Sequence, residues 1–200
     1  VDEAHGAHMY FSDQLPEGAL AQGADMCAQS IHKVTGSLTQ SSMLHVKSKL
    51  VDIDRLEATL HIVQSTSPSY LLMTSLDLAR YELAVNGKEM INNAVELSNY
   101  GREEINKIEG MICLGKSVEG KAGIKALDTT RLTIRASKLG ITGFALKSML
   151  FNDYGVDVEL SDFMNVLAIV TYANNKEDID RLISALKDIA QKHNGGKEIE

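Results

Sequence analysis

Gln29-Ser30-Ile31-His32-Lys33 places a hydroxyl, an imidazole and an amine within four residues. The run Met26 to Gln29 predicts a short buried strand that delivers these polar side chains at its end. Upstream, Val1-Asp2-Glu3-Ala4-His5 adds carboxylates and a further imidazole after what we interpret as the last part of another strand. Open α/β sheets bind ligands beyond the carboxyl ends of their strands. We therefore predict that the two polar clusters meet around one ligand.

The composition is that of a globular protein, because the 200 residues are 44% hydrophobic and 24% charged. The net charge of −7 gives no reason to expect nucleic acid as a partner. The longest apolar run, Val166 to Val170, is far shorter than the about 20 residues that cross a bilayer. We therefore expect no membrane partner.

Two cysteines, Cys27 and Cys113, lie in apolar surroundings. Reduced, buried thiols are the ordinary state of such residues in a cytosolic protein, which favours a cytoplasmic location. Neither cysteine has a second ligand at the spacing typical of zinc sites, so no metal is expected.

The first half of the chain alternates short strands with helices. Leu15 to Leu20 indicates a helical turn, and Ser42 to Val46 alternates as a third strand. Asp52 is a favourable N-cap, and the helix that it predicts must end before Pro68. Tyr70 to Val85 predicts the next helix.

Asn86-Gly87 is a typical turn dipeptide, which predicts a break before the following segment. Apolar residues from Ile91 to Ile108 recur at helical spacing and predict a long amphipathic helix. Helices of this length often connect two domains.

The last third predicts a small α+β layer, an antiparallel sheet with helices on one side. The predicted elements follow in the order β-α-β-β-α, with Asn174 as the cap of the final helix and Asn194-Gly195 as its end. The predicted elements are a strand at 130–136, a helix at 142–154, strands at 156–160 and 165–172, and a helix after 174. The domain limits that we predict are 1–85, the C-terminal part of a large domain; 86–128, a linker helix and strand; 129–194, a small domain; and 195–200, a tail.

Two short patterns suggest nucleotide hydrolysis, and the sequence argues against both. Asp2-Glu3-Ala4-His5 spells the acidic box of a helicase family, and the stretch from Gly110 to Ser117 matches the phosphate-loop pattern G-x-x-x-x-G-K-S. Met111 to Leu114, however, is a continuous apolar run that predicts a buried strand. The phosphate loop of a helicase also precedes its acidic box, which is the reverse of the order here.

Lys33 could be an ordinary solvated lysine, and its immediate neighbours alone favour that interpretation. Pyridoxal 5′-phosphate chemistry, however, needs the set of groups found here. An amine binds the cofactor covalently, a carboxylate keeps the pyridine nitrogen protonated, and hydroxyl and imidazole groups hold the phosphate. Asp2, Ser30, His32 and Lys33 provide one group for each role.

Four ordered motifs resemble the bacterial ornithine/lysine/arginine decarboxylases, which are pyridoxal-phosphate enzymes of the aspartate-aminotransferase fold type. The motifs are Val-Asp-Glu-Ala-His-Gly-Ala-His at 1–8, Gln-Ser-Ile-His-Lys at 29–33, Gly-Ser-Leu-Thr-Gln at 36–40 and Gln-Ser-Thr-Ser-Pro-Ser-Tyr-Leu-Leu at 64–72. The segment from Leu132 to Ala190 also resembles the family's small domain. The implied fold class is α/β, part of a fold-type-I large domain followed by a small α+β domain.

The resemblance also implies roles for single residues. Lys33 resembles the lysine that carries the cofactor, and Ile31 stands where the family has threonine. Thr66 and Ser67 would contact the cofactor phosphate of the partner subunit in a homodimer. The other implied cofactor contacts are Asp2 at the pyridine nitrogen, Ala4 on a ring face, His5 near the phenolic oxygen, and Ser30 and His32 at the phosphate.

The implied function is decarboxylation of arginine, lysine or ornithine, giving agmatine or a diamine for polyamine synthesis. The family chain has a segment before the aspartate strand and a further C-terminal domain, so we expect this chain to be a fragment that is inactive alone. Two alternatives stay open. One is an α-oxoamine synthase, although the segment from Gly36 to Gln40 lacks that family's glycine-rich run. The other is a non-catalytic fragment.

Overall fold

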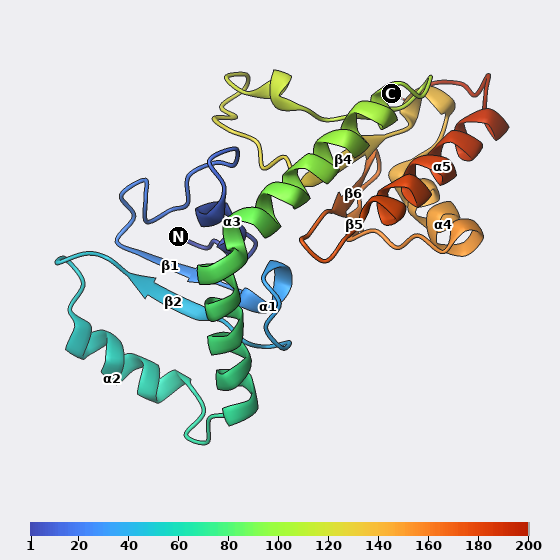
Figure 1. The fold of residues 1–200 in the computed structure, drawn as a ribbon. Coiled ribbons are helices and arrows are strands. Elements are labelled where there is room, and N and C mark those ends of the chain that lie inside the picture. Colours follow the sequence, from blue (N-terminus) through green and yellow to red (C-terminus); the bar gives the residue numbers. More distant parts are fainter. Residues whose placement is uncertain (200) are drawn as a thin grey trace. The chain divides into compact units, whose positions relative to one another are not determined.

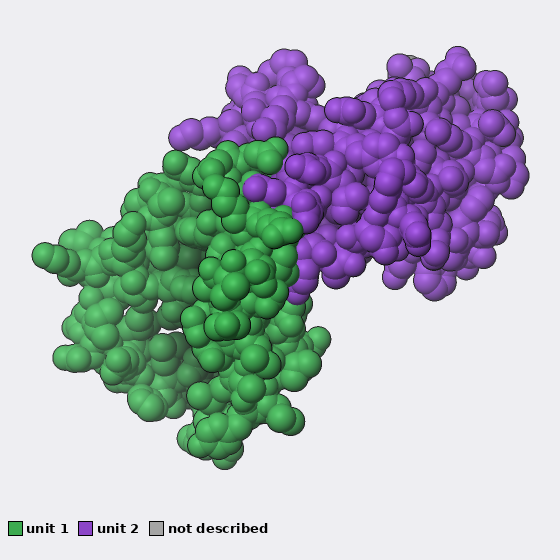
Figure 2. Space-filling model, viewed as in Figure 1, with its two compact units in different colours: residues 1–91 green, residues 92–200 purple. Residues whose placement is uncertain are grey.

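A computed structural model describes residues 1–199. The chain divides into two compact units, residues 1–91 and residues 92–200 (Figure 2). The helix α3 (Tyr70–Asn106) contributes its first part to one unit and its last part to the other. Among residues 1–199, no helix is both long enough and apolar enough to cross a membrane.

Two of the three strands predicted for the first unit are present, and the predicted N-terminal strand is reduced to a single bridge at Asp2. β1 (Met26–Gln29) pairs antiparallel with β2 (Met43–Val46), while Asp2 forms a parallel bridge with Ala28 on the other side of β1 (Figure 1). The N-terminal segment and β1 therefore end at the same edge, as predicted. A small apolar core lies beside this sheet, made of Ala7, Ile31, Val34 and Ala79 with Met43 and Leu76 packed against them.

The segment between the bridge at Asp2 and β1 is mostly irregular. It begins with the 3-10 helix η1 (Ala7–Phe11). The helical turn predicted at 15–20 is wrong in its position, since the hydrogen-bonded turn lies after Gly18, whose carbonyl accepts from Ala21 N at 3.0 Å. A side chain at Gly18 would meet the Tyr10 ring, because its Cβ would lie 2.1 Å from Cζ. A residue larger than glycine would therefore clash with Tyr10 at this position.

The two long helices that begin in the first unit start where the sequence predicts, whereas the short helix after β1 was not predicted. The four-residue helix α1 (Ile31–Val34) follows β1 directly. α2 (Ile53–Val63) begins at Asp52, whose side chain accepts a hydrogen bond from Arg55 N at 3.0 Å. The break predicted at Asn86-Gly87 is wrong, because α3 continues through it. Gly87 is instead a point of close packing, where a Cβ would lie 2.7 Å from Phe11 Cδ1.

The second unit is the predicted antiparallel sheet with helices. Its strand order is β3-β4-β6-β5, and Figure 1 shows α4 and α5 on the same side of it. Side chains of both helices join those of β4 and β6 in one large core. The elements are β3 (Ile112–Cys113), the 3-10 helix η2 (Lys116–Val118), β4 (Arg131–Arg135), the 3-10 helix η3 (Ser137–Leu139), α4 (Gly143–Tyr154), β5 (Leu160–Ser161), β6 (Asn165–Ile169) and α5 (Lys176–Lys192).

Several boundaries in the second unit differ from prediction, and β6, for example, ends at Ile169 and not at residue 172. β5 begins only at Leu160, so the strand predicted from Val156 is wrong over most of its length. The cap of α5 is Asn175 and not Asn174, because the Asn175 side chain accepts from Asp178 N. Asn174 instead accepts a hydrogen bond from Thr171 N at 2.9 Å, which fixes the preceding turn.

The segment that matches the phosphate-loop pattern contributes a strand to the sheet, as predicted, but the strand is shorter than 111–114 and its Ile112 is exposed. Met111 is buried, and Ile112–Cys113 form the edge strand β3. Cys113 is also buried and forms no disulfide, and the same holds for Cys27. Burial raises the pKa of the Cys113 thiol to about 11, so this thiol stays protonated at neutral pH.

Candidate active site

The candidate site lies where the N-terminal segment and β1 end side by side. Glu3 N donates to Ala28 O at 2.9 Å, and Ser30 N donates to Ala4 O at 3.3 Å. These backbone bonds hold residues 2–5 against residues 28–30. The structure therefore brings the two polar clusters together, as the sequence predicts.

Lys33 and His5 meet at this edge. Lys33 Nζ lies 3.1 Å from His5 Nε2, although the two residues are 28 positions apart in the chain. Lys33 is the third residue of α1, and its backbone N–H donates to Ser30 O at 3.1 Å. Its side chain is exposed, so the amine is accessible to a ligand. One of the two nitrogens must carry the shared proton, which makes the pair able to exchange it.

Asp2 is held in place by its own chain. Its Oδ1 accepts a hydrogen bond from Ala4 N at 3.0 Å, which closes a turn at the end of the strand. The carboxylate is exposed and keeps capacity for further donors. Since successive side chains of an extended segment point to opposite sides, Glu3 faces away from Asp2.

Glu3 is the centre of a hydrogen-bond network that sequence reasoning missed. Its Oε1 accepts from Ala19 N at 2.6 Å, and its Oε2 accepts from Gln29 Nε2 at 2.6 Å and from the Tyr10 hydroxyl at 3.0 Å. Burial raises the pKa of Glu3, but these hydrogen bonds outweigh it and leave the pKa below 4.5. Glu3 thus ties the irregular segment to β1.

The side chains around Glu3 also have shifted pKa values. Burial, together with the Glu3 carboxylate and against a hydrogen bond to Leu20 N, raises the pKa of Tyr10 to about 12. Burial and then Glu3 raise the pKa of the Cys27 thiol. The sequence does place Glu3 between two predicted site residues, Asp2 and Ala4. Its hydrogen-bond partners, however, lie up to 26 residues away.

Ser30 and His32 both precede Lys33 in the chain, by three residues and by one. Ser30 occupies the N-cap of α1, yet its side chain makes no capping hydrogen bond. His32 is half-buried, and its Nδ1 lies 2.7 Å from Ser41 O in the loop after α1. Ile31 lies between them in the sequence, and its side chain is buried in the small core.

Thr66 and Ser67 lie apart from these residues, in the exposed connection between α2 and α3 (Figure 1). Ser67 N donates to Ser65 Oγ at 3.1 Å, so the loop is closed by its own hydroxyls. Within residues 1–199, neither Thr66 nor Ser67 is hydrogen-bonded to Lys33, Ser30 or His32. Their assignment to a partner subunit's site stays a prediction.

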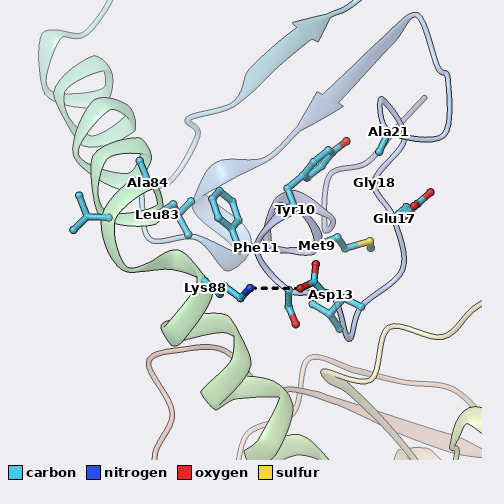
Figure 3. Close-up of a pocket in the computed structure, with 13 residues that line it drawn as sticks. Met9, Tyr10, Phe11, Asp13, Glu17, Gly18, Ala21, Leu83, Ala84 and Lys88 are labelled. Carbon is cyan, nitrogen blue, oxygen red and sulfur yellow. Dashed lines mark hydrogen bonds and ion pairs between the residues drawn. The ribbon is translucent and has the colours of Figure 1, made fainter.

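A cavity of about 720 Å³ lies beside the Glu3 network and was not foreseen from the sequence. Figure 3 shows Tyr10 and Phe11 on one wall, with Leu83 of α3 nearby. Lys88 Nζ lies 3.5 Å from Asp13 Oδ2 at its rim, an exposed pair that contributes little to stability. None of the predicted site residues lines this cavity.

Solved structures share this fold. A lysine decarboxylase from Francisella novicida matches with a TM-score of 0.79 and 20% identity, covering 95% of this chain and 32% of that one. An alanine–glyoxylate aminotransferase from Nostoc sp. matches with a TM-score of 0.70 and 18% identity, covering 94% and 52%. These matches confirm the predicted fold class, part of a fold-type-I large domain followed by a small α+β domain.

Curated relatives share a higher sequence identity with this chain than the solved structures above. The arginine decarboxylase of Halalkalibacterium halodurans is 43% identical over 196 residues, which cover 98% of this chain and 40% of the relative. The chain thus spans about two fifths of the length of that curated relative. Residues 1–178 match the family model described as the major domain of Orn/Lys/Arg decarboxylases, and the chain belongs to this family.

Proposed function

We propose that this chain provides the lysine side of the cofactor site in a pyridoxal-phosphate-dependent decarboxylase of a basic amino acid. The observation that carries the proposal is the 3.1 Å contact between Lys33 Nζ and His5 Nε2, at the edge where Asp2 also lies. Membership of the Orn/Lys/Arg decarboxylase family supports this reaction over that of an α-oxoamine synthase.

The groups at this edge fit the cofactor chemically. Lys33 offers an exposed primary amine for the aldehyde, and Asp2 offers an exposed carboxylate for the pyridine nitrogen. The hydroxyl of Ser30, which is not used as a helix cap, and the imidazole of His32 suit a phosphate. Ala4 is small enough to leave room for a flat ring.

Bound pyridoxal 5′-phosphate supplies an electron sink for the charge left on the substrate's α-carbon when the carboxylate departs as carbon dioxide. Lys33 Nζ must lose a proton before it can bond to an aldehyde, and His5 Nε2 at 3.1 Å can accept that proton. The same amine can later return a proton to the α-carbon. Asp2 would keep a proton on the ring nitrogen of the bound cofactor, because a carboxylate favours the charged form of its partner.

The wider assembly is also proposed. Residues 1–85 would be the cofactor-bearing part and residues 129–194 the small domain, joined by residues 86–128. In a homodimer, Thr66 and Ser67 of one subunit would reach the phosphate bound to the other, which agrees with the exposure of their loop. The buried thiols of Cys27 and Cys113, which form no disulfide, favour a cytoplasmic location. The product there would be agmatine or a diamine.

The test of the reaction is carbon dioxide release from arginine, lysine and ornithine by the complete gene product. We expect release from one of the three, and loss of about 10⁴-fold or more in kcat for Lys33→Ala. Lys47→Ala is the matched control, because Lys47 is exposed and lies beyond the end of β2. Release from none of the three amino acids would contradict the proposal.

A further inference from the structure

The loop that follows α1, residues 35–42, orients the ring of His32. His32 Nδ1 lies 2.7 Å from the backbone oxygen of Ser41. A carbonyl oxygen can only accept a hydrogen bond, so Nδ1 must carry a proton. In the neutral ring the other nitrogen, Nε2, then has a lone pair. Within residues 1–199 no protein group is hydrogen-bonded to Nε2.

The backbone of this loop is held in an unusual conformation. Gln40 has a φ of 73°, in the left-handed region that residues with side chains rarely adopt. Such a conformation persists only where the surrounding contacts determine it. It turns the chain directly before Ser41, so that the Ser41 carbonyl points back to α1 and meets the His32 ring.

Buried hydroxyl groups fix the position of Ser41. Its side chain is buried, and its Oγ donates to Leu38 O at 2.5 Å and lies 2.5 Å from the Oγ of Ser37. Leu38 N in turn donates to the Oγ of Ser75 on α3 at 3.1 Å. The carbonyl that binds His32 is therefore anchored to a long helix as well as to its own loop.

We propose that Ser41 is a positioning residue that keeps His32 in the Nδ1–H tautomer, so that Nε2 is the atom that meets a phosphate monoester. This inference rests on the proposed function, because it assigns the phosphate side of that site. A tautomer fixed by a backbone carbonyl is also how proteins orient histidines that bind metals.

The proton count follows from the tautomer. A phosphate monoester has its second pKa near 6, so both its monoanion and its dianion are present near neutral pH. The monoanion donates its own P–OH proton to the lone pair of Nε2. The dianion has no proton to donate, so the ring must first take up a proton at Nε2 from the solvent. The phosphate oxygen then accepts a hydrogen bond from Nε2–H. In either case one proton lies between Nε2 and a phosphate oxygen, and the bond from Nδ1 to Ser41 is unchanged.

The direct test is nitrogen-15 NMR of the histidine rings of this chain, with His32 assigned by the loss of its signals in His32→Asn. Without ligand we expect a protonated Nδ1 and an unprotonated Nε2. Inorganic phosphate or pyridoxal 5′-phosphate should shift Nε2 toward the protonated value and leave Nδ1 nearly unchanged, whereas pyridoxal without phosphate should shift neither. A proton on Nε2 in the free chain, or equal shifts of both nitrogens, would overturn the inference.

This measurement separates the inference from the proposed function. The tautomer of the free chain does not depend on any cofactor, and inorganic phosphate tests the anion site alone. If inorganic phosphate shifts Nε2 but pyridoxal 5′-phosphate binds no better than phosphate, the inference stands and the cofactor assignment fails.

A double-mutant cycle tests whether Ser41 acts through His32. We expect Ser41→Ala to weaken binding of pyridoxal 5′-phosphate about fivefold, the effect of about one neutral hydrogen bond. Ser42→Ala, at the exposed neighbouring position, should leave binding unchanged. In a His32→Ala background, Ser41→Ala should have no further effect. An equal loss in both backgrounds would show a merely structural role and overturn the proposal.

Discussion

Residues 1–91 and residues 92–200 keep their shape by different means. The second unit has a large apolar core that includes Leu132, Leu146 and Leu186, each 0% exposed. The first has the small core around Ile31 and Val34, and it exposes large apolar side chains on α2 and α3, such as Ile62 and Tyr70. The first unit is therefore stabilised largely by backbone hydrogen bonds and polar networks, whereas the second is stabilised mainly by apolar packing. Its candidate site is held chiefly by hydrogen bonds.

The largest expected contrast comes from core truncation. Leu146→Ala should cost the second unit about 4 kcal/mol, because it leaves a cavity in a packed core. Val34→Ala should cost the first unit about 2 kcal/mol, since its core is small and partly open. Denaturant unfolding combined with amide hydrogen exchange measures both. Equal losses, or exchange that rises in both units for either variant, would contradict two separate cores.

Arg102 is a polar exception inside the second unit. It is buried, and its guanidinium donates to the carbonyls of Leu114 at 2.7 Å, Thr129 at 2.7 Å and Arg131 at 3.0 Å. Arg102→Met would leave these oxygens without their charged donor, and we expect a loss of about 3 kcal/mol. Arg135→Met, at an exposed position on β4, is the control. A loss below about 1 kcal/mol for Arg102→Met would mean that water replaces the donor.

The Glu3 network gives the first unit a pH dependence. Because the pKa of Glu3 is below 4.5 in the folded chain, the unfolded chain binds a proton at this group at higher pH. Its contribution is therefore complete above about pH 4.5 and disappears as the pH falls through the folded value. Glu3→Gln should cost about 1 kcal/mol at pH 7 and less at pH 3. A loss that does not change with pH would contradict this account.

The smallest effects come from two helix caps. Asp52 caps α2, which buries none of its residues, while Asn175 caps α5, which buries seven. Each cap is worth about 1 kcal/mol of local helix stability. Asn175→Ala should lower the unfolding midpoint of the second unit, whereas Asp52→Ala should only speed amide exchange within α2. A fall in the midpoint of the first unit with Asp52→Ala would show that α2 is coupled to its core.

Local features were predictable from the sequence. β1 was predicted with its observed bounds, and Asp52 was identified as the cap of its helix, because strand alternation and capping depend on neighbouring residues. The meeting of Lys33 with the N-terminal cluster followed from the rule that strands of one sheet present their ends together. The contact between Lys33 and His5 joins residues that follow these two neighbouring segments, as this rule predicts.

Features that depend on distant contacts were not predictable. Gly87 was interpreted as a turn because nothing nearby in the sequence reveals that Phe11 packs against it. Glu3 could not be identified as a network centre, since its partners Tyr10, Ala19 and Gln29 come from three separate segments. The role of Ser41 is likewise hidden, because it depends on a backbone carbonyl that any residue type would provide.

The central claim is that Lys33 is the residue that binds the cofactor. The most direct test is to incubate the protein with pyridoxal 5′-phosphate, reduce any covalent link with borohydride, and locate the label by peptide mass spectrometry. We predict that the label is concentrated on Lys33, in the peptide that also contains His32, and that it is lost in Lys33→Arg. A label spread over exposed lysines such as Lys47 and Lys88, with none enriched on Lys33, would contradict the account.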